Sequence, residues 1–145
     1  MLMFLENDQV YRIPERSILD QASGAFARRV FILIREEAGH PDNLPFLNKI
    51  LAAAQIHLEK DTLFIQVSPD EPLSLLPVLK EKHPDTVLVF GVPLQQVGIV
   101  AEIPFYQPYI FYGARFLLAD SLSVLAPDKV RKGKLWQALQ QMFLH

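Results

Sequence analysis

The sequence contains no cysteine, and this absence removes several classes of protein at once. Disulfide frameworks, thiolate metal sites, iron–sulfur clusters and cysteine nucleophiles are all excluded for these 145 residues. The histidines do not have the spacing of metal ligands. They are His40, His57, His83 and His145. We therefore expect neither a metal site nor a cofactor.

Long hydrophobic runs and an excess of one charge are absent too. An apolar run such as residues 30–34 is far shorter than the about 20 residues of a membrane-spanning helix. The N-terminus has no basic region and soon meets Glu6 and Asp8, so we expect no signal peptide. With Lys+Arg 14, Asp+Glu 16 and a net charge of -2, overall charge does not favour nucleic acid. We predict a soluble, cytoplasmic protein without a membrane partner.

Apolar side chains, in contrast, are plentiful enough for one core. Hydrophobic residues make up 50% of the chain and charged residues 21%, which excludes intrinsic disorder. The length fits one domain. We predict a single domain over residues 1–145, in which residues 1–14 form an N-terminal arm or an edge strand.

Apolar runs without polar alternation predict strands buried on both faces of a sheet. Such a run lies at residues 30–34. Further strands are predicted at residues 62–67, which are rich in β-branched and aromatic side chains, and at residues 86–91 and 115–119. Helical spacing of apolar residues predicts intervening helices. These lie at residues 18–26, 44–54, 73–80 and 127–143. Residues 92–114 are predicted to be loop-rich with one or two short strands, and Gly91 permits a sharp exit from the third strand. The alternation predicts an α/β fold, a three-layer sandwich with a mainly parallel central sheet.

Three segments in this order resemble the bacterial and archaeal uracil-DNA glycosylases. Residues 30–34, their loop and the sequence Leu47-Asn48-Lys49-Ile50-Leu51 resemble the first strand, active-site loop and following helix of that family. His83-Pro84-Asp85 before the strand at 86–91 resembles a second segment. Residues 116–136 resemble the last strand, catalytic loop and closing helix, with Leu125, Lys132 and Trp136 in register. The resemblance implies a uracil-DNA glycosylase-like fold.

The residues that carry catalysis in the family are altered in this chain. The family's first loop offers an acidic or amide side chain that handles the attacking water. Here that loop contains Glu36, Glu37 and Asp42, and the family's small residue is Arg35. The family's histidine, which stabilises the uracil oxyanion, and the proline after it are replaced by Ser121 and Leu122. Loss of an oxyanion donor typically costs about 10²–10³ in rate.

The resemblance therefore implies a degenerate, non-catalytic member of the superfamily. The psi accessory subunits of bacterial DNA polymerase III are non-catalytic members, similar in length and also without both motifs. A protein partner, such as a replisome component, follows from this resemblance. The alternative is a divergent uracil-DNA glycosylase or another nucleotide-processing hydrolase. It would use Glu36, Glu37, Asp42 and Ser121, although the three acidic residues also fit solvated loop charges.

Two further clusters are candidate binding residues. The basic residues near the start of the last helix can meet DNA phosphates or simply face solvent; they are Lys129, Arg131, Lys132 and Lys134. Aromatic residues in the loop-rich stretch can form a partner surface, a base-stacking platform or ordinary core; they are Phe105, Tyr106, Tyr109 and Tyr112, with Phe111 beside them. We predict a binding or scaffolding protein of DNA replication or repair; the sequence leaves the oligomeric state open.

Overall fold

The computed structural model describes residues 22–69 and 71–144, and a five-stranded sheet lies at its centre. The strand order is β2-β1-β3-β5-β4. Four strands are mutually parallel, and β4 pairs with β5 in the antiparallel sense. The strands are β1 (Val30–Arg35), β2 (Thr62–Val67), β3 (Thr86–Phe90), β4 (Tyr109–Phe111) and β5 (Ala114–Ala119). This confirms the predicted α/β class and its mainly parallel central sheet.

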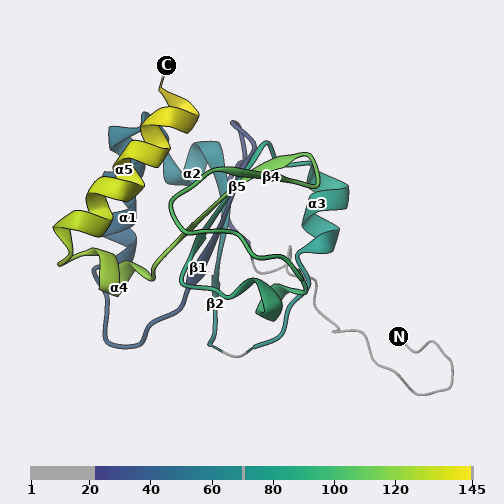
Figure 1. Cartoon of the computed structure of the whole chain (residues 1–145), viewed down its shortest axis with the longest axis horizontal. Helices are drawn as coiled ribbons and strands as arrows, with labels where there is room; N and C mark the ends of the chain where they lie inside the picture. Colours follow the sequence, from purple (N-terminus) through teal and green to yellow (C-terminus); the bar gives the residue numbers. More distant parts are fainter. Residues whose placement is uncertain (1–21, 70, 145) are drawn as a thin grey trace, which may run out of the picture.

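Helices cover both faces of the sheet (Figure 1). One face is covered by α1 (Asn43–Ala53), α2 (Leu58–Asp61), α4 (Leu122–Leu125) and α5 (Lys129–Phe143). The other face is covered by α3 (Leu76–Lys82) and the 3₁₀ helix η2 (Leu94–Val97). Within the described ranges, no helix combines the length and hydropathy needed to span a membrane.

Side chains from the two faces of β1 belong to two separate hydrophobic cores. Phe31 and Leu33 pack beneath α3 and η2, whereas Ile32 and Ile34 pack beneath α1 and α5. All four side chains are buried. Successive side chains of a strand point to opposite faces, so a strand buried on both faces needs apolar residues at every position. This is why the run at 30–34 shows no polar alternation.

The predicted helix at residues 18–26 is wrong for its described part. From Ala22 the chain is irregular, and Ser23 forms an isolated antiparallel bridge with Phe64 at the edge of β2. Gly24 has φ +120°, and a Cβ there would lie 2.0 Å from the carbonyl oxygen of Thr62. The close contact of this segment with β2 outweighs its helix propensity and sets its conformation. The predicted arm at residues 1–14 lies outside the described residues.

One helix boundary and two short helices also differ from the prediction. The helix predicted from Leu73 begins only at Leu76, because Leu73 and Leu75 donate backbone hydrogen bonds to the carbonyl groups of Gln96 and Val97. The short helices α2 and α4 were not predicted. Each has four residues, too few for the apolar spacing of a helix to be recognised.

The loop-rich stretch ends in a tight hairpin. Phe111 pairs with Ala114, which leaves Tyr112 and Gly113 as a two-residue turn. Their φ angles are +56° and +78°, as a type I′ turn requires. The predicted short strand is thus β4, and it is an outer strand of the sheet.

Candidate binding site at the carboxyl edge of the sheet

The sheet order creates a crevice where β1 and β3 end. The two strands are neighbours, but the chain leaves β1 towards β2 on one side and leaves β3 towards β5 on the other. The connection after β1 leads to α1 on one face, and that after β3 leads to η2 on the opposite face. Such a switch point at the carboxyl ends of parallel strands is where α/β proteins bind ligands.

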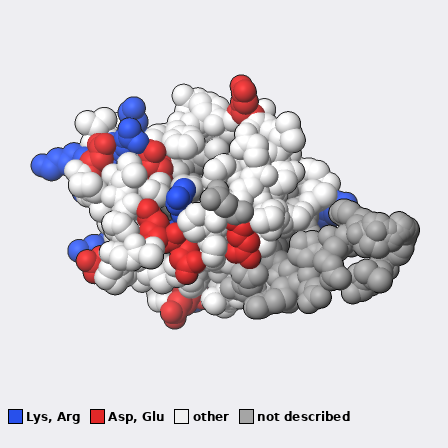
Figure 2. Space-filling model, turned by 90° about the horizontal axis from the view of Figure 1, so that it is seen from below, with Lys and Arg blue, Asp and Glu red and all other residues white. Residues whose placement is uncertain are grey.

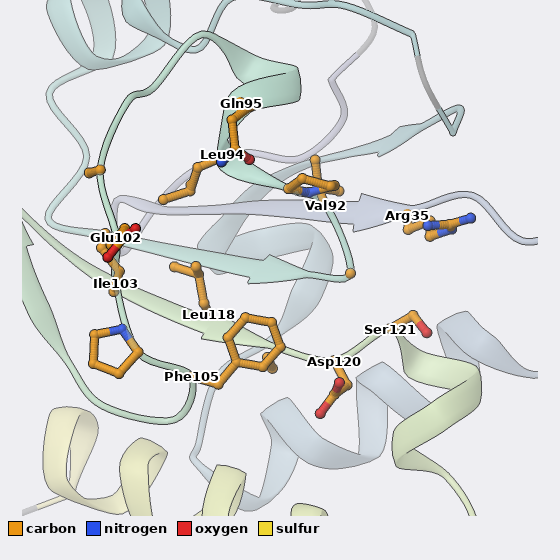
Figure 3. A pocket seen from close by; sticks show the side chains of 15 residues that line it. Arg35, Val92, Leu94, Gln95, Glu102, Ile103, Phe105, Leu118, Asp120 and Ser121 are labelled. Carbon is orange, nitrogen blue, oxygen red and sulfur yellow. The ribbon is translucent and has the colours of Figure 1, made fainter.

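A cavity of about 720 Å³ lies at this edge, and we call it the edge cavity. Its volume falls within the about 300–1,000 Å³ of typical ligand pockets. Its walls include the buried side chains of Val92, Leu94, Ile103 and Leu118, with the half-exposed ring of Phe105 beside them (Figure 3). The edge cavity therefore presents an apolar floor.

Polar groups lie around this floor. Arg35 comes from the end of β1, Glu102 from the loop after η2, and Asp120 and Ser121 from the end of β5. Figure 3 shows Arg35 and Glu102 at opposite ends of the edge cavity. Opposite charges on the rim of an apolar floor favour an amphipathic ligand over a purely apolar one.

Gly91 brings the ends of β3 and β5 close together. It has φ +77°, and a Cβ there would lie 2.7 Å from the Cβ and 2.8 Å from the Cα of Ser121. A side chain at position 91 would push these two strand ends apart. The glycine thus fixes the place of Ser121, which precedes α4 as its N-cap residue.

Asp120 is held in a side-chain network. It accepts a hydrogen bond from the Tyr106 hydroxyl and forms an ion pair with Arg131 at 2.9 Å. Its backbone N–H in turn donates to the Tyr106 oxygen at 3.2 Å. Burial and the hydrogen bond to Asp120 raise the pKa of Tyr106 to about 12. Asp120 therefore orders the loop and α5 around it, with its charge matched by Arg131.

Glu37 is also held by neighbouring groups. Its carboxylate accepts hydrogen bonds from the Ser123 hydroxyl, the Ser123 backbone N–H at 3.2 Å and the Asn43 amide at 2.9 Å. Burial by itself raises the pKa of Glu37, but these hydrogen bonds and the nearby His40 outweigh it and lower the pKa. Glu37 thus ties the β1 loop to the start of α4.

The four predicted catalytic residues do not converge on one point. Glu36 and Glu37 line a second cavity of about 620 Å³ together with His40, and Glu36 accepts a hydrogen bond from Ser68 at 2.9 Å. Ser121 lines the edge cavity instead. Asp42 is exposed and precedes α1 without a side-chain capping bond. Among the residues that the structure describes, no cluster of three or more histidine and acidic side chains could hold a metal ion.

The carboxyl edge carries a strong excess of negative charge. The segments that follow the parallel strands contain no lysine or arginine at residues 36–42, 68–75, 91–108 and 120–128. Their described carboxylates belong to Glu36, Glu37, Asp42, Glu71, Glu102, Asp120 and Asp128. Figure 2 looks onto this edge and shows acidic atoms across its middle with few basic atoms among them. This field repels phosphate groups.

The predicted basic cluster on α5 divides between two sides of the helix. Arg131 is paired with Asp120 and Asp128, and it lines a cavity together with Lys134. Lys132 lies instead in a groove with Lys49 and Trp136, next to α1. Lys129 is exposed. The structure therefore does not bring the four cations together as one patch.

The predicted aromatic partner residues fall into three environments. Tyr109 and Tyr112 are 47% and 55% exposed on the hairpin, where Ile110 beside them is 73% exposed. Phe105 is 49% exposed at the rim of the edge cavity. Tyr106 is half-buried and bonded to Asp120. We call Tyr109, Ile110 and Tyr112 the hairpin patch.

Sequence reasoning named Arg35, Phe105 and Ser121 among the residues that line the edge cavity but missed its apolar floor. Apart from Leu118 of β5, this floor comes from residues 92–103, whose apolar residues have no regular spacing. The one available signal was Gly91 after an apolar strand, which indicated a sharp turn at the carboxyl edge. Two comparisons with known proteins add no relative. No protein-family model matches the chain, and no curated protein matches it.

Proposed function

We propose that this protein is a non-catalytic binding protein of DNA replication or repair with a uracil-DNA glycosylase-like fold. The observation that carries the proposal is the engagement of Glu37 and Asp120, the half-buried carboxylates beside the two cavities. Both are bound by groups of the surrounding loops and helices. A parallel sheet covered on both faces agrees with the fold that the resemblance implies.

The state of Glu37 argues against acid–base chemistry. A general base that works near neutral pH is favoured by a raised carboxyl pKa, whereas the pKa of Glu37 is lowered. Its oxygen atoms already accept hydrogen bonds from Ser123 and Asn43. Ser121, at the position of the family's histidine, offers a neutral hydroxyl in place of an imidazole. The hydrogen bonds of Glu37 therefore fit a role in holding the loops together better than a role in activating water.

The hairpin patch supports binding to a protein partner. It lies on the outer strand β4, and residues 103–114 contain no charged residue. Edge strands are normally protected from association by charged side chains or coverage. Exposed tyrosine and isoleucine at an unprotected edge are typical of surfaces that a partner covers. We assign this patch to the partner protein.

Charge favours a protein over DNA as the partner. Binding to the DNA backbone depends on lysine and arginine contacts with phosphates. The loops at the carboxyl edge have none, and the cations of α5 are divided between two sides of the helix. The resemblance to psi subunits points to a component of the replication machinery as the protein that binds the hairpin patch.

A pull-down of the intact protein from its own cells tests the proposal. Clamp-loader components of the polymerase are expected to co-purify with the natural chain and to be lost with Ile110→Asp. Val130→Asp is the matched control, because Val130 is also apolar and 69% exposed but lies on α5. Absence of polymerase components, or equal retention by both variants, would contradict the proposed partner.

The enzymatic alternative needs a separate assay. Because Glu36, Glu37 and His40 line one cavity, a divergent hydrolase remains a rival explanation. Uracil excision from single- and double-stranded oligonucleotides is expected to be undetectable. Robust cleavage that disappears in Glu36→Gln or Glu37→Gln would overturn the non-catalytic assignment.

A further inference from the structure

We infer that the edge cavity is the docking site for a short basic segment of a partner protein, with one apolar side chain anchored in the cavity and flanking lysine or arginine residues on the acidic edge. This goes beyond the proposed function, because it concerns a second surface and does not depend on the hairpin patch. The edge cavity and the charge around it carry the inference.

The floor of the edge cavity fits an apolar anchor. Val92, Leu94, Ile103 and Leu118 are each less than 10% exposed, yet they line an open cavity of about 720 Å³. The Phe105 ring, 49% exposed, offers a flat apolar wall beside them. A leucine or aromatic side chain inserted here would lose its water contact on several sides. Such buried anchors dominate the affinity of protein interfaces.

The charges around the edge cavity favour a basic partner segment. Glu102 is exposed at one end, while Asp120 is already matched by Arg131. Glu36, Glu37 and Asp42 extend the negative field along the neighbouring loop. Arg35 is the cation at the opposite end of the cavity from Glu102. Carboxylates outnumber cations over the whole edge, so a basic segment meets attraction where DNA or an acidic peptide meets repulsion.

Selection from a displayed library of random twelve-residue peptides on the intact protein tests the inference. The enriched peptides are expected to combine a leucine or aromatic residue with flanking lysine or arginine. One enriched peptide, labelled with a fluorophore, then gives affinities by fluorescence polarisation at low and high salt. Binding should weaken as salt rises, because rim charges are screened. No enrichment, or enriched peptides without net positive charge, would overturn the inference.

Variants locate the peptide in the edge cavity. Glu102→Lys should weaken binding about tenfold, because a like charge replaces an opposite one. Phe105→Ser should weaken it through loss of the apolar wall. Glu59→Lys is the matched control, since Glu59 is exposed on α2, which leads into the amino end of β2. Unchanged affinity in both Glu102→Lys and Phe105→Ser would refute the location.

The same variants separate this inference from DNA binding and from the hairpin patch. A single-stranded oligonucleotide bound at this edge would bind more tightly to Glu102→Lys, the opposite sign to the basic peptide. Ile110→Asp should leave the peptide affinity unchanged. Loss of peptide binding in Ile110→Asp would assign the peptide to the hairpin patch and overturn the inference.

Discussion

Replacement of Gly91 by alanine tests the geometry on which the edge cavity depends. Gly91 combines a φ of +77° with a close approach to Ser121: a new Cβ would lie 2.7 Å from the Cβ and 2.8 Å from the Cα of Ser121. An L-residue in the left-handed region costs about 1–2 kcal/mol. Forcing an extra methyl group into a packed site adds about 1–3 kcal/mol. We expect Gly91→Ala to lower the free energy of unfolding by about 2–5 kcal/mol.

Gly39→Ala is the matched control for the conformational part of this cost. Gly39 has a similar φ of +82°, but nothing lies within 4 Å of a Cβ built there. It should therefore lose only the about 1–2 kcal/mol of the left-handed conformation. Urea unfolding followed by the fluorescence of Trp136, the single tryptophan, measures both variants. Equal losses in the two variants would refute the close approach of β3 and β5.

Three further predictions concern side chains around the site. The pKa of Glu37 is lowered from the ordinary carboxyl value of about 4.5. The stability that the charged Glu37 contributes should therefore be complete above pH about 4.5 and should be lost as the pH falls through the lower pKa of the folded state. Acid titration of unfolding should show a smaller loss in Glu37→Gln, and an identical profile would contradict the hydrogen bonds from Ser123. The pKa of Tyr106 is raised from 10.0 to about 12. The stability that its protonated hydroxyl contributes should therefore be complete below pH about 10 and should be lost as the pH rises towards 12. Tyr106→Phe should remove a late step from the ultraviolet titration of the tyrosines; a step that persists would argue against the bond to Asp120. Tyr112→Asn should raise the free energy of unfolding, because asparagine avoids part of the about 1–2 kcal/mol that the left-handed conformation costs other residues, yet it should weaken partner binding. A loss of stability would refute the turn geometry.

Tyr112 occupies a position of the hairpin turn that does not favour tyrosine. A two-residue turn of this type favours asparagine or glycine at its first position. Tyrosine stands there with φ +56° and is 55% exposed, although its ring centroid lies 6.0 Å from that of Phe111. Retention of a residue in an unfavourable backbone conformation is a feature of functional sites. The exposed Tyr112 is therefore consistent with the proposal that a partner covers the hairpin patch.

The engaged carboxylates also explain how loops of irregular sequence keep a defined shape. Glu37 joins the loop after β1 to α4, and Asp120 joins the loop before β4 to α5. A hydrogen bond to a charged group contributes about 1.5–3 kcal/mol when well shielded and less at the surface. The two acidic side chains thus organise the edge around the cavity.

The sequence by itself determined the four parallel strands of the sheet, although not their order. Residues 30–34 are apolar at every position, and a strand requires this when helices cover both of its faces. The apolar stripe of α1 and the capping Asp128 of α5, which accepts a hydrogen bond from the Arg131 backbone N–H, are equally local signals. Local patterns of this kind reflect periodicity within one element, so they can be read without knowing its neighbours.

Only the tertiary structure decided what the candidate residues do. The sequence placed Glu36, Glu37, Asp42 and Ser121 in one hypothetical site. In the fold, Ser121 lines a different cavity from the two glutamates, and Glu37 is bound by a partner 86 positions away. The non-helical segment at Ala22 to Phe26 and the edge cavity likewise depend on contacts between segments that are distant in the sequence. Such contacts are set by how the two cores pack against the sheet, and no spacing along the chain encodes them.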